Sequence, residues 1–132
     1  ALAALLALDL GGGVAANATL TTKRWYHRPG QGLRDHLGFI AAHIHPLIVG
    51  LVFGGGDWLY GLVGYGGLLV AALIILRTAP RLQLPIALLL YLCAVLIGLY
   101  ALPDIPGMAW FVPVFYLKLL VAHLLPPGAN MR

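Results

Sequence analysis

Long apolar runs alternate with short polar stretches along the whole chain, and the polar stretches hold nearly all of the charged, proline and turn-forming residues. Each run is roughly 17 to 22 residues long, which at about 1.5 Å per residue matches a hydrocarbon core about 30 Å thick. Such runs leave no polar face to meet water. The pattern therefore predicts five membrane-spanning helices, at residues 1–22, 37–53, 58–76, 84–102 and 108–125.

The composition agrees with this prediction. Of the 132 residues, 61% are hydrophobic and 9% are charged, whereas a soluble domain has about 25% charged residues. We therefore expect an all-α, polytopic integral membrane bundle that forms a single domain over residues 1–132. Its expected place is a bacterial or archaeal cell membrane.

Basic residues alternate between the predicted loops. They follow the first, third and fifth spans, and the other two loops carry Asp57 and Asp104 without any Lys or Arg. The positive-inside rule then predicts an N-terminus outside the cell and a C-terminus in the cytoplasm. The basic loop residues are Lys23, Arg24, Arg28, Arg34, Arg77, Arg81 and Arg132.

A cleaved signal peptide is the main alternative for the first segment, because Ala16, Asn17 and Ala18 resemble a small-residue cleavage site. In a signal peptide, however, the positive charges precede the apolar stretch, and here they follow it. We therefore interpret the segment as a membrane helix.

Proline and glycine mark special points in the spans. Pro46 removes a backbone donor inside the second span and leaves the Ala42 carbonyl without its usual partner, so a kink is predicted there. On a regular helix His43 and His45 would point about 200° apart, and only a kink would let both face one site. Small residues recur at helix-packing spacing, which predicts close helix contacts within a tight bundle or in an oligomer. They are Gly12 with Ala16, Gly50 with Gly54, and Gly61, Gly64 and Gly67.

Two charged residues lie inside predicted spans. A charge at membrane depth costs several kcal/mol unless it is paired or hydrated, so Asp9 and Lys118 are functional candidates and are predicted to be electrostatic partners. The alternatives are a shallower first span for Asp9 and snorkelling of Lys118 towards the membrane surface.

Histidines are the second chemical signal. The predicted topology places several of them in the cytoplasmic half of the membrane, where imidazoles, Asp and Lys can transfer protons. We therefore expect a polar site that moves protons, ions or a small solute. Its predicted residues are Asp9, Asn17, His43, His45, Lys118 and His123.

Three other uses of the histidines remain open. Each ring can simply be buried and bonded to a neighbouring carbonyl. His43 and His123 on facing helices could be the axial ligands of a haem. A metal ion could bind the candidates His36, His43 and His123, with a nearby aspartate.

A basic and aromatic loop follows the first span, and its residues Lys23, Arg24, Trp25 and Arg28 would suggest nucleic acid in a soluble protein. Beside a membrane helix, this pattern instead predicts contact with anionic lipid headgroups, and no nucleic-acid partner is expected.

Hydrolytic catalysis is not expected. The sequence has no glutamate, no HExxH motif and no Ser, His and Asp in a catalytic order, so no catalytic residue is assigned. Two rivals to transport remain, a non-catalytic accessory subunit of a larger membrane complex and a haem- or quinone-binding redox protein. Because five short spans make a thin bundle, we expect a homo-oligomer or a subunit of a larger assembly.

Overall fold

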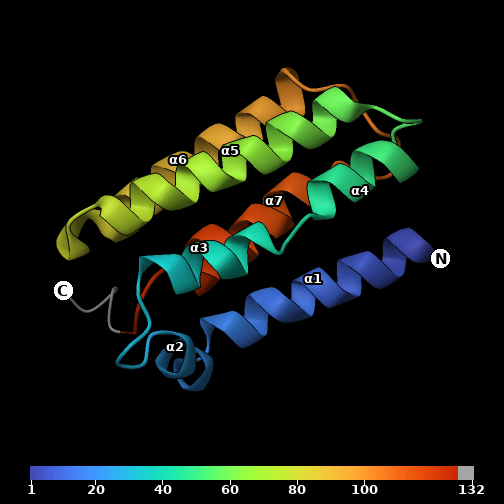
Figure 1. The fold of residues 1–132 in the computed structure, drawn as a ribbon. Coiled ribbons are helices and arrows are strands. Elements are labelled where there is room, and N and C mark those ends of the chain that lie inside the picture. Colours follow the sequence, from blue (N-terminus) through green and yellow to red (C-terminus); the bar gives the residue numbers. More distant parts are fainter. Residues whose placement is uncertain (128–132) are drawn as a thin grey trace.

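The computed structural model describes residues 1–127, and every regular element in that range is helical. Most of the helices run side by side along one axis, whereas α2 lies across one end of the bundle (Figure 1). Arg132, counted above among the basic residues, lies outside the described range. The elements are α1 (Leu2–Ala18), α2 (Leu20–Tyr26), α3 (Leu33–Ala41), α4 (His45–Val52), α5 (Trp58–Arg77), the 3₁₀ turn η1 (Pro80–Leu82), α6 (Gln83–Tyr100), α7 (Phe111–Tyr116) and the π-helical η2 (Leu117–His123).

Three helical segments are long and apolar enough to cross a membrane, namely Leu33–Val52, Trp58–Arg77 and Pro80–Tyr100. A fourth is added if α1 and α2, which are bent by 83° to each other, form one span. The segment Phe111–His123 is apolar but shorter. The chain is therefore a helical protein with three to four candidate membrane spans.

The predicted span at residues 1–22 ends earlier than expected. The Thr19 hydroxyl donates to the Ala16 carbonyl at 2.7 Å and accepts from the backbone N–H of Thr22 at 3.3 Å. Thr19 thus caps the start of α2 and turns the chain. Hydropathy alone does not register this cap, which is why the sequence places the approximate end of the segment at residue 22.

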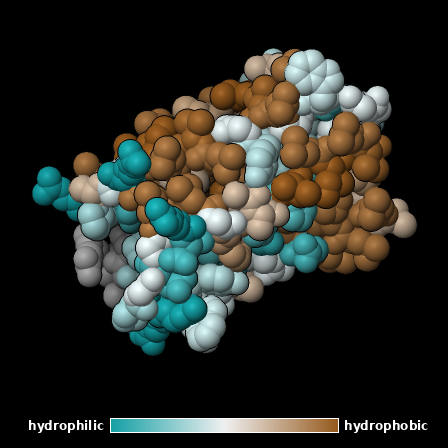
Figure 2. Space-filling view, viewed as in Figure 1, coloured by the Kyte–Doolittle hydropathy of each residue, from teal (hydrophilic) through white to brown (hydrophobic). Residues whose placement is uncertain are grey.

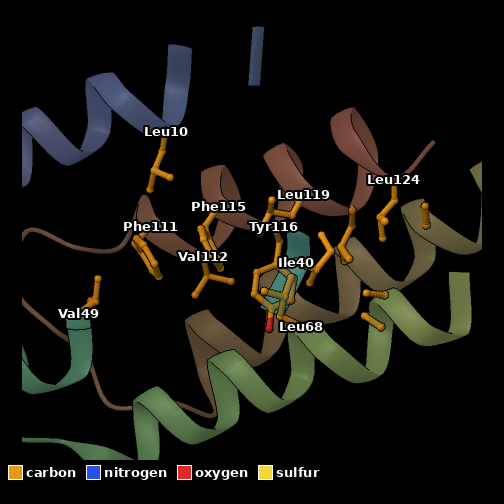
Figure 3. Packing of buried hydrophobic residues seen from close by; sticks show 14 of the residues in the cluster. Leu10, Ile40, Val49, Leu68, Phe111, Val112, Phe115, Tyr116, Leu119 and Leu124 are labelled. Carbon is orange, nitrogen blue, oxygen red and sulfur yellow. The ribbon is translucent and has the colours of Figure 1, made fainter. Parts of the chain in front are cut away.

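The central element is α7 with its continuation η2. Figure 3 shows side chains from neighbouring helices, among them Leu10 of α1, Val49 of α4 and Leu68 of α5, gathered around this segment. Helix α6 packs against it on the outside of the bundle. The side chains of this segment that are at most 1% exposed are Phe111, Phe115, Leu119 and Leu120.

Glycines allow α4 and α5 to approach closely. A Cβ at Gly50 would lie 2.4 Å from the Asp57 carbonyl oxygen, and one at Gly64 would lie 2.9 Å from Cβ of Pro46. These predicted contacts are confirmed. At Gly12 a Cβ would meet nothing within 4 Å in the described chain, so the contact predicted there does not lie within this part of the chain, and a contact in an oligomer stays a prediction.

The two ends of the bundle differ in polarity. Hydrophilic atoms gather at the end where α2 lies, and hydrophobic atoms cover most of the rest of the face in Figure 2. The α2–α3 connection and the α5–α6 turn both lie at that end, and the α4–α5 and α6–α7 connections lie at the other (Figure 1). We call the first of these ends the basic end, because most of the Lys and Arg residues of the described chain lie in its connections and in the adjoining helix ends. They are Lys23, Arg24, Arg28, Arg34, Arg77 and Arg81.

Candidate functional site

The α3–α4 span is interrupted in the middle, between Ala41 and His45. Pro46 cannot donate to the Ala42 carbonyl, which accepts instead from the backbone N–H of Ile44 at 3.1 Å. The Tyr65 hydroxyl of α5 donates to the Ala41 carbonyl at 2.5 Å. Non-helical backbone at membrane depth is tolerated where such groups are satisfied inside the protein or line a cavity.

This interruption brings two histidines together. The rings of His43 and His45 are stacked, with centroids 5.5 Å apart and planes inclined by 27°. Nδ1 of His43 donates to the Phe39 carbonyl at 2.7 Å, which fixes the first ring. The predicted interruption near Pro46 is confirmed, and it has the expected effect of pairing residues that a regular helix would hold apart.

Lys118 reaches towards the same region from η2. A Cβ at Gly13 of α1 would lie 2.5 Å from Cε and 2.9 Å from Nζ of Lys118, so this glycine makes room for the lysine side chain. Asp9 lies one helical turn before Gly13 and on the same side of α1. Asp9 is exposed in the described chain, and its charge and that of Lys118 have only a minor electrostatic influence on His43 and His45.

The π-helical winding of η2 affects the position of its polar residues. Its i→i+5 pattern is seen in the bond from the Leu124 N–H to the Leu119 carbonyl at 3.1 Å. Lys118 and His123 are five residues apart, and this winding brings them closer to one side of the segment than an α-helix would. Short π-helices are rare and frequently occur at functional sites.

Four buried side-chain atoms have no hydrogen-bond partner within residues 1–127. They are Nδ2 of Asn17, Nδ1 of His45 and both ring nitrogens of His123. Buried polar groups normally have a partner, and all four atoms belong to residues of the predicted site. Asn17 lies one turn after Gly13 on α1, so Asp9, Gly13 and Asn17 share a side of that helix.

The five histidines of the sequence form one row from the basic end to the broken helix. His27 and His36 are stacked with centroids 4.5 Å apart, and His36 lies 6.1 Å from His123. The Phe39 ring comes next, 3.8 Å from His123 and 4.7 Å from His43. His45 ends the row.

His27 and Lys23 were missed as part of this arrangement. Nε2 of His27 donates to the His123 carbonyl at 2.9 Å, and Nζ of Lys23 donates to the carbonyls of Ala122 and Leu125 at 2.6 and 2.7 Å. Burial lowers the pKa of His27, as does the nearby Lys23 charge, while the bond to the carbonyl raises it by less. These partners are backbone atoms about 100 residues away, so the sequence holds no signal for them.

The four residues predicted to meet lipid headgroups have different surroundings. Lys23 is turned inward to the carbonyls at the end of η2, whereas Arg24 and Trp25 are exposed. The Arg28 guanidinium stacks on the Trp25 ring at 4.0 Å and donates to the Trp25 carbonyl at 2.7 Å.

The three histidines predicted as candidate metal ligands are not brought together. Within residues 1–127, no group of three or more His, Cys, Asp or Glu side chains is arranged to hold a metal ion, so the candidates His36, His43 and His123 do not form one. The Phe39 ring contacts both His123 and His43.

No family model, curated protein or solved structure matches this chain. The functional argument therefore rests on the site itself, which combines titratable side chains, an interrupted helix and buried polar atoms available for hydrogen bonding.

Proposed function

We propose that this chain is a multi-pass membrane protein that moves protons, alone or together with a small solute, across the bilayer. The observation that carries the proposal is the interruption between α3 and α4, which stacks His43 on His45 beside the charges of Lys118 and Asp9. Charged and titratable groups inside a membrane are costly and mark ion pathways and proton relays. Broken helices at membrane depth form the binding sites of many transporters.

In this proposal the chain crosses the membrane five times, through α1, α3–α4, α5, α6 and α7–η2, with the N-terminus outside. The basic end then faces the cytoplasm, as the positive-inside rule requires. Cysteine scanning tests this orientation after Cys93, which is exposed, is replaced by Ser. Cysteine placed at Asp57 or Asp104 should react with an impermeant thiol reagent added to whole cells, and cysteine at Arg28 should not. The reverse labelling pattern would overturn the orientation.

Proton movement is tested with purified protein in liposomes that enclose a pH-sensitive dye. A potassium diffusion potential drives the protons, and the protein should raise the rate of internal pH change at least tenfold over empty liposomes. His43→Ala, His45→Ala and Asp9→Asn should each remove most of this rate. Asp104→Asn is the matched control, because it removes an exposed carboxylate from a loop far along the chain from the site. A wild-type rate equal to that of empty liposomes would contradict the proposal.

A second candidate function is that of an accessory subunit in a larger membrane complex. The observation that favours it is the open position of α6, in which Ala87 is the single buried residue within the described chain. A neighbouring subunit could cover this helix as well as lipid can. Native mass measurement of protein extracted in mild detergent would show a partner chain or further copies, and a bare monomer would contradict this function.

A further inference from the structure

A cavity of about 290 Å³ opens at the basic end of the bundle. It lies between the start of α3, the α5–α6 turn and the end of η2. Its polar wall is formed by His27, Gln31, His36 and Gln83. Since it holds two of the five histidines and is far larger than the ~30 Å³ that one water fills, it can admit water to the first part of the histidine row.

His36 and His123 continue from this cavity into the bundle. His36 lines the cavity but is only 8% exposed, and the His123 ring, 6.1 Å away between centroids, is 2% exposed. Both His123 nitrogens lack a partner in the described chain. A neutral imidazole carries one N–H and one lone pair, so it can accept a proton at one nitrogen and release one from the other.

We propose that protons reach the His43 and His45 pair from the basic end, through the cavity, His36 and His123, and that the Phe39 ring is the gate on this path. This inference rests on the proposed proton transport. In each transfer the N–H bond of one ring breaks as the lone pair of the next ring, or of an intervening water, takes the proton. One proton enters at the cavity for each proton delivered to His43, and no oxidation or reduction is involved.

Phe39 is the gate because it is the one member of the row that cannot carry a proton. Its ring is stacked on His123, with planes inclined by 17°, and it also contacts His43. The His43 Nδ1 is bonded to the carbonyl of the same residue, so a movement of Phe39 would affect both sides of the gate. Transfer between His123 and His43 therefore requires the phenyl ring to turn aside or a water to enter beside it.

Several charged groups face this row and add to the effect that burial has on its histidines. The Lys23 charge interacts electrostatically with the rings of His27 and His123, and the Asp35 charge does so with the His36 ring. At the far end, Lys118 and Asp9 act on His43 and His45. Any pH dependence of the flux therefore belongs to the row together with these charges.

The route is tested with the liposome assay described above. His36→Ala and His123→Leu should each lower the proton flux at least tenfold, whereas Phe39→Ala should raise it severalfold by opening the gate. Leu37→Ala is the matched control, since it shortens a partly buried side chain of the same helix without touching the row. Its flux should equal that of the wild type.

Chemical rescue distinguishes a variant that has lost only its imidazole from one that is misfolded. Free imidazole fits the cavity and should restore at least half of the flux to His36→Ala, which a misfolded protein would not show. If His36→Ala and His123→Leu conduct like the wild type while His43→Ala does not, transport stands and this route is wrong. If the wild type does not conduct, the proposed function itself fails.

Discussion

Helix α6 and the segment formed by α7 and η2 are both apolar, but they occupy opposite positions in the bundle. Within the described chain, α6 has Ala87 as its single buried residue, and leucines such as Leu89 and Leu92 are more than half exposed. The α7–η2 segment lies at the centre, with Phe115 and Leu119 fully buried. In water this difference would be read as hydrophobic burial, but a lipid tail is as apolar as a leucine side chain.

The two segments therefore differ in a property of their sequences other than hydropathy. The central segment carries Lys118 and His123, whose polar groups are costly in contact with lipid, and large aromatic side chains that fill the space between helices. Helix α6 has no charged residue or histidine. In this protein, polar atoms and aromatic volume indicate which helix is central, and hydropathy alone does not.

The largest expected effect on stability comes from truncating a fully buried side chain of the central segment. Phe115→Ala removes a fully buried ring that contacts Phe111 and His45. It should lower the free energy of unfolding in detergent by about 3 kcal/mol, near the lower end of the range for buried phenylalanines because detergent competes for the apolar surface. Leu89→Ala in α6 should change it by less than about 0.5 kcal/mol. Equal losses would show that the two segments do not differ in burial.

A smaller effect is expected from two charges, Lys118 of the central segment and Asp9 of α1. Lys118 lies against Gly13, one turn from Asp9, which is exposed in the described chain. We expect the two charges to compensate each other, so that removing either leaves the other uncompensated. In a double-mutant cycle with Asp9→Asn and Lys118→Met, we expect a coupling energy of about 1–3 kcal/mol in detergent stability. The pair Asp104→Asn and Lys118→Met should be additive. An additive result for Asp9 as well would leave Lys118 better explained by snorkelling.

Much of this arrangement follows from sequence, because its signals are local. The apolar runs predict the helices, and Pro46 predicts where the second span is interrupted. That interruption explains why His43 and His45 share a site. Asp9 and Lys118 stand out because a charge in an apolar run has few harmless explanations.

The features that the sequence does not predict depend on backbone atoms. The bonds from Lys23 and His27 end on carbonyls of η2, and every residue has a carbonyl. The π-helical winding has no residue signature, and Thr19 does not stand out until its cap on α2 is seen. Gly12 has the same spacing as the packed glycines but faces no neighbour in the described chain, so spacing alone does not tell a contact within the chain from one in an oligomer.

A still smaller effect on stability is expected from one of two tyrosines, Tyr116 in α7 and Tyr100 in α6. The Tyr116 hydroxyl donates to the Gly64 carbonyl of α5, and this residue is 5% exposed. Tyr116→Phe should cost about 1 kcal/mol of stability, the usual net value of one hydrogen bond. Tyr100, at the end of α6, is 83% exposed, so Tyr100→Phe should have no measurable effect on stability. Thermal unfolding followed by circular dichroism in detergent compares the two, and an unchanged Tyr116→Phe would remove this bond as a reason for the central position of α7.

The smallest expected effect is a pH dependence at the end of the central segment, where the side chains of Lys23 and His27 donate to backbone carbonyls of η2. We call these bonds the clasp. Burial lowers the pKa of His27 in the folded protein, so the unfolded chain, with an ordinary pKa of about 6.5, binds more protons. The contribution of His27 to stability should therefore be complete above about pH 6.5 and should decrease as the pH falls below it, because protonation favours the unfolded state.

His27→Gln keeps a side-chain donor for the His123 carbonyl but does not titrate, so its melting temperature should fall less than that of the wild type between pH 7.5 and 5. Lys23, His36 and His123 face the same ring, and the difference between the two curves isolates the share of His27. Arg24→Gln, an exposed change in the same helix, should reproduce the wild-type curve. Parallel curves for His27→Gln and the wild type would mean that the clasp is insensitive to pH and that any acid instability arises deeper in the row.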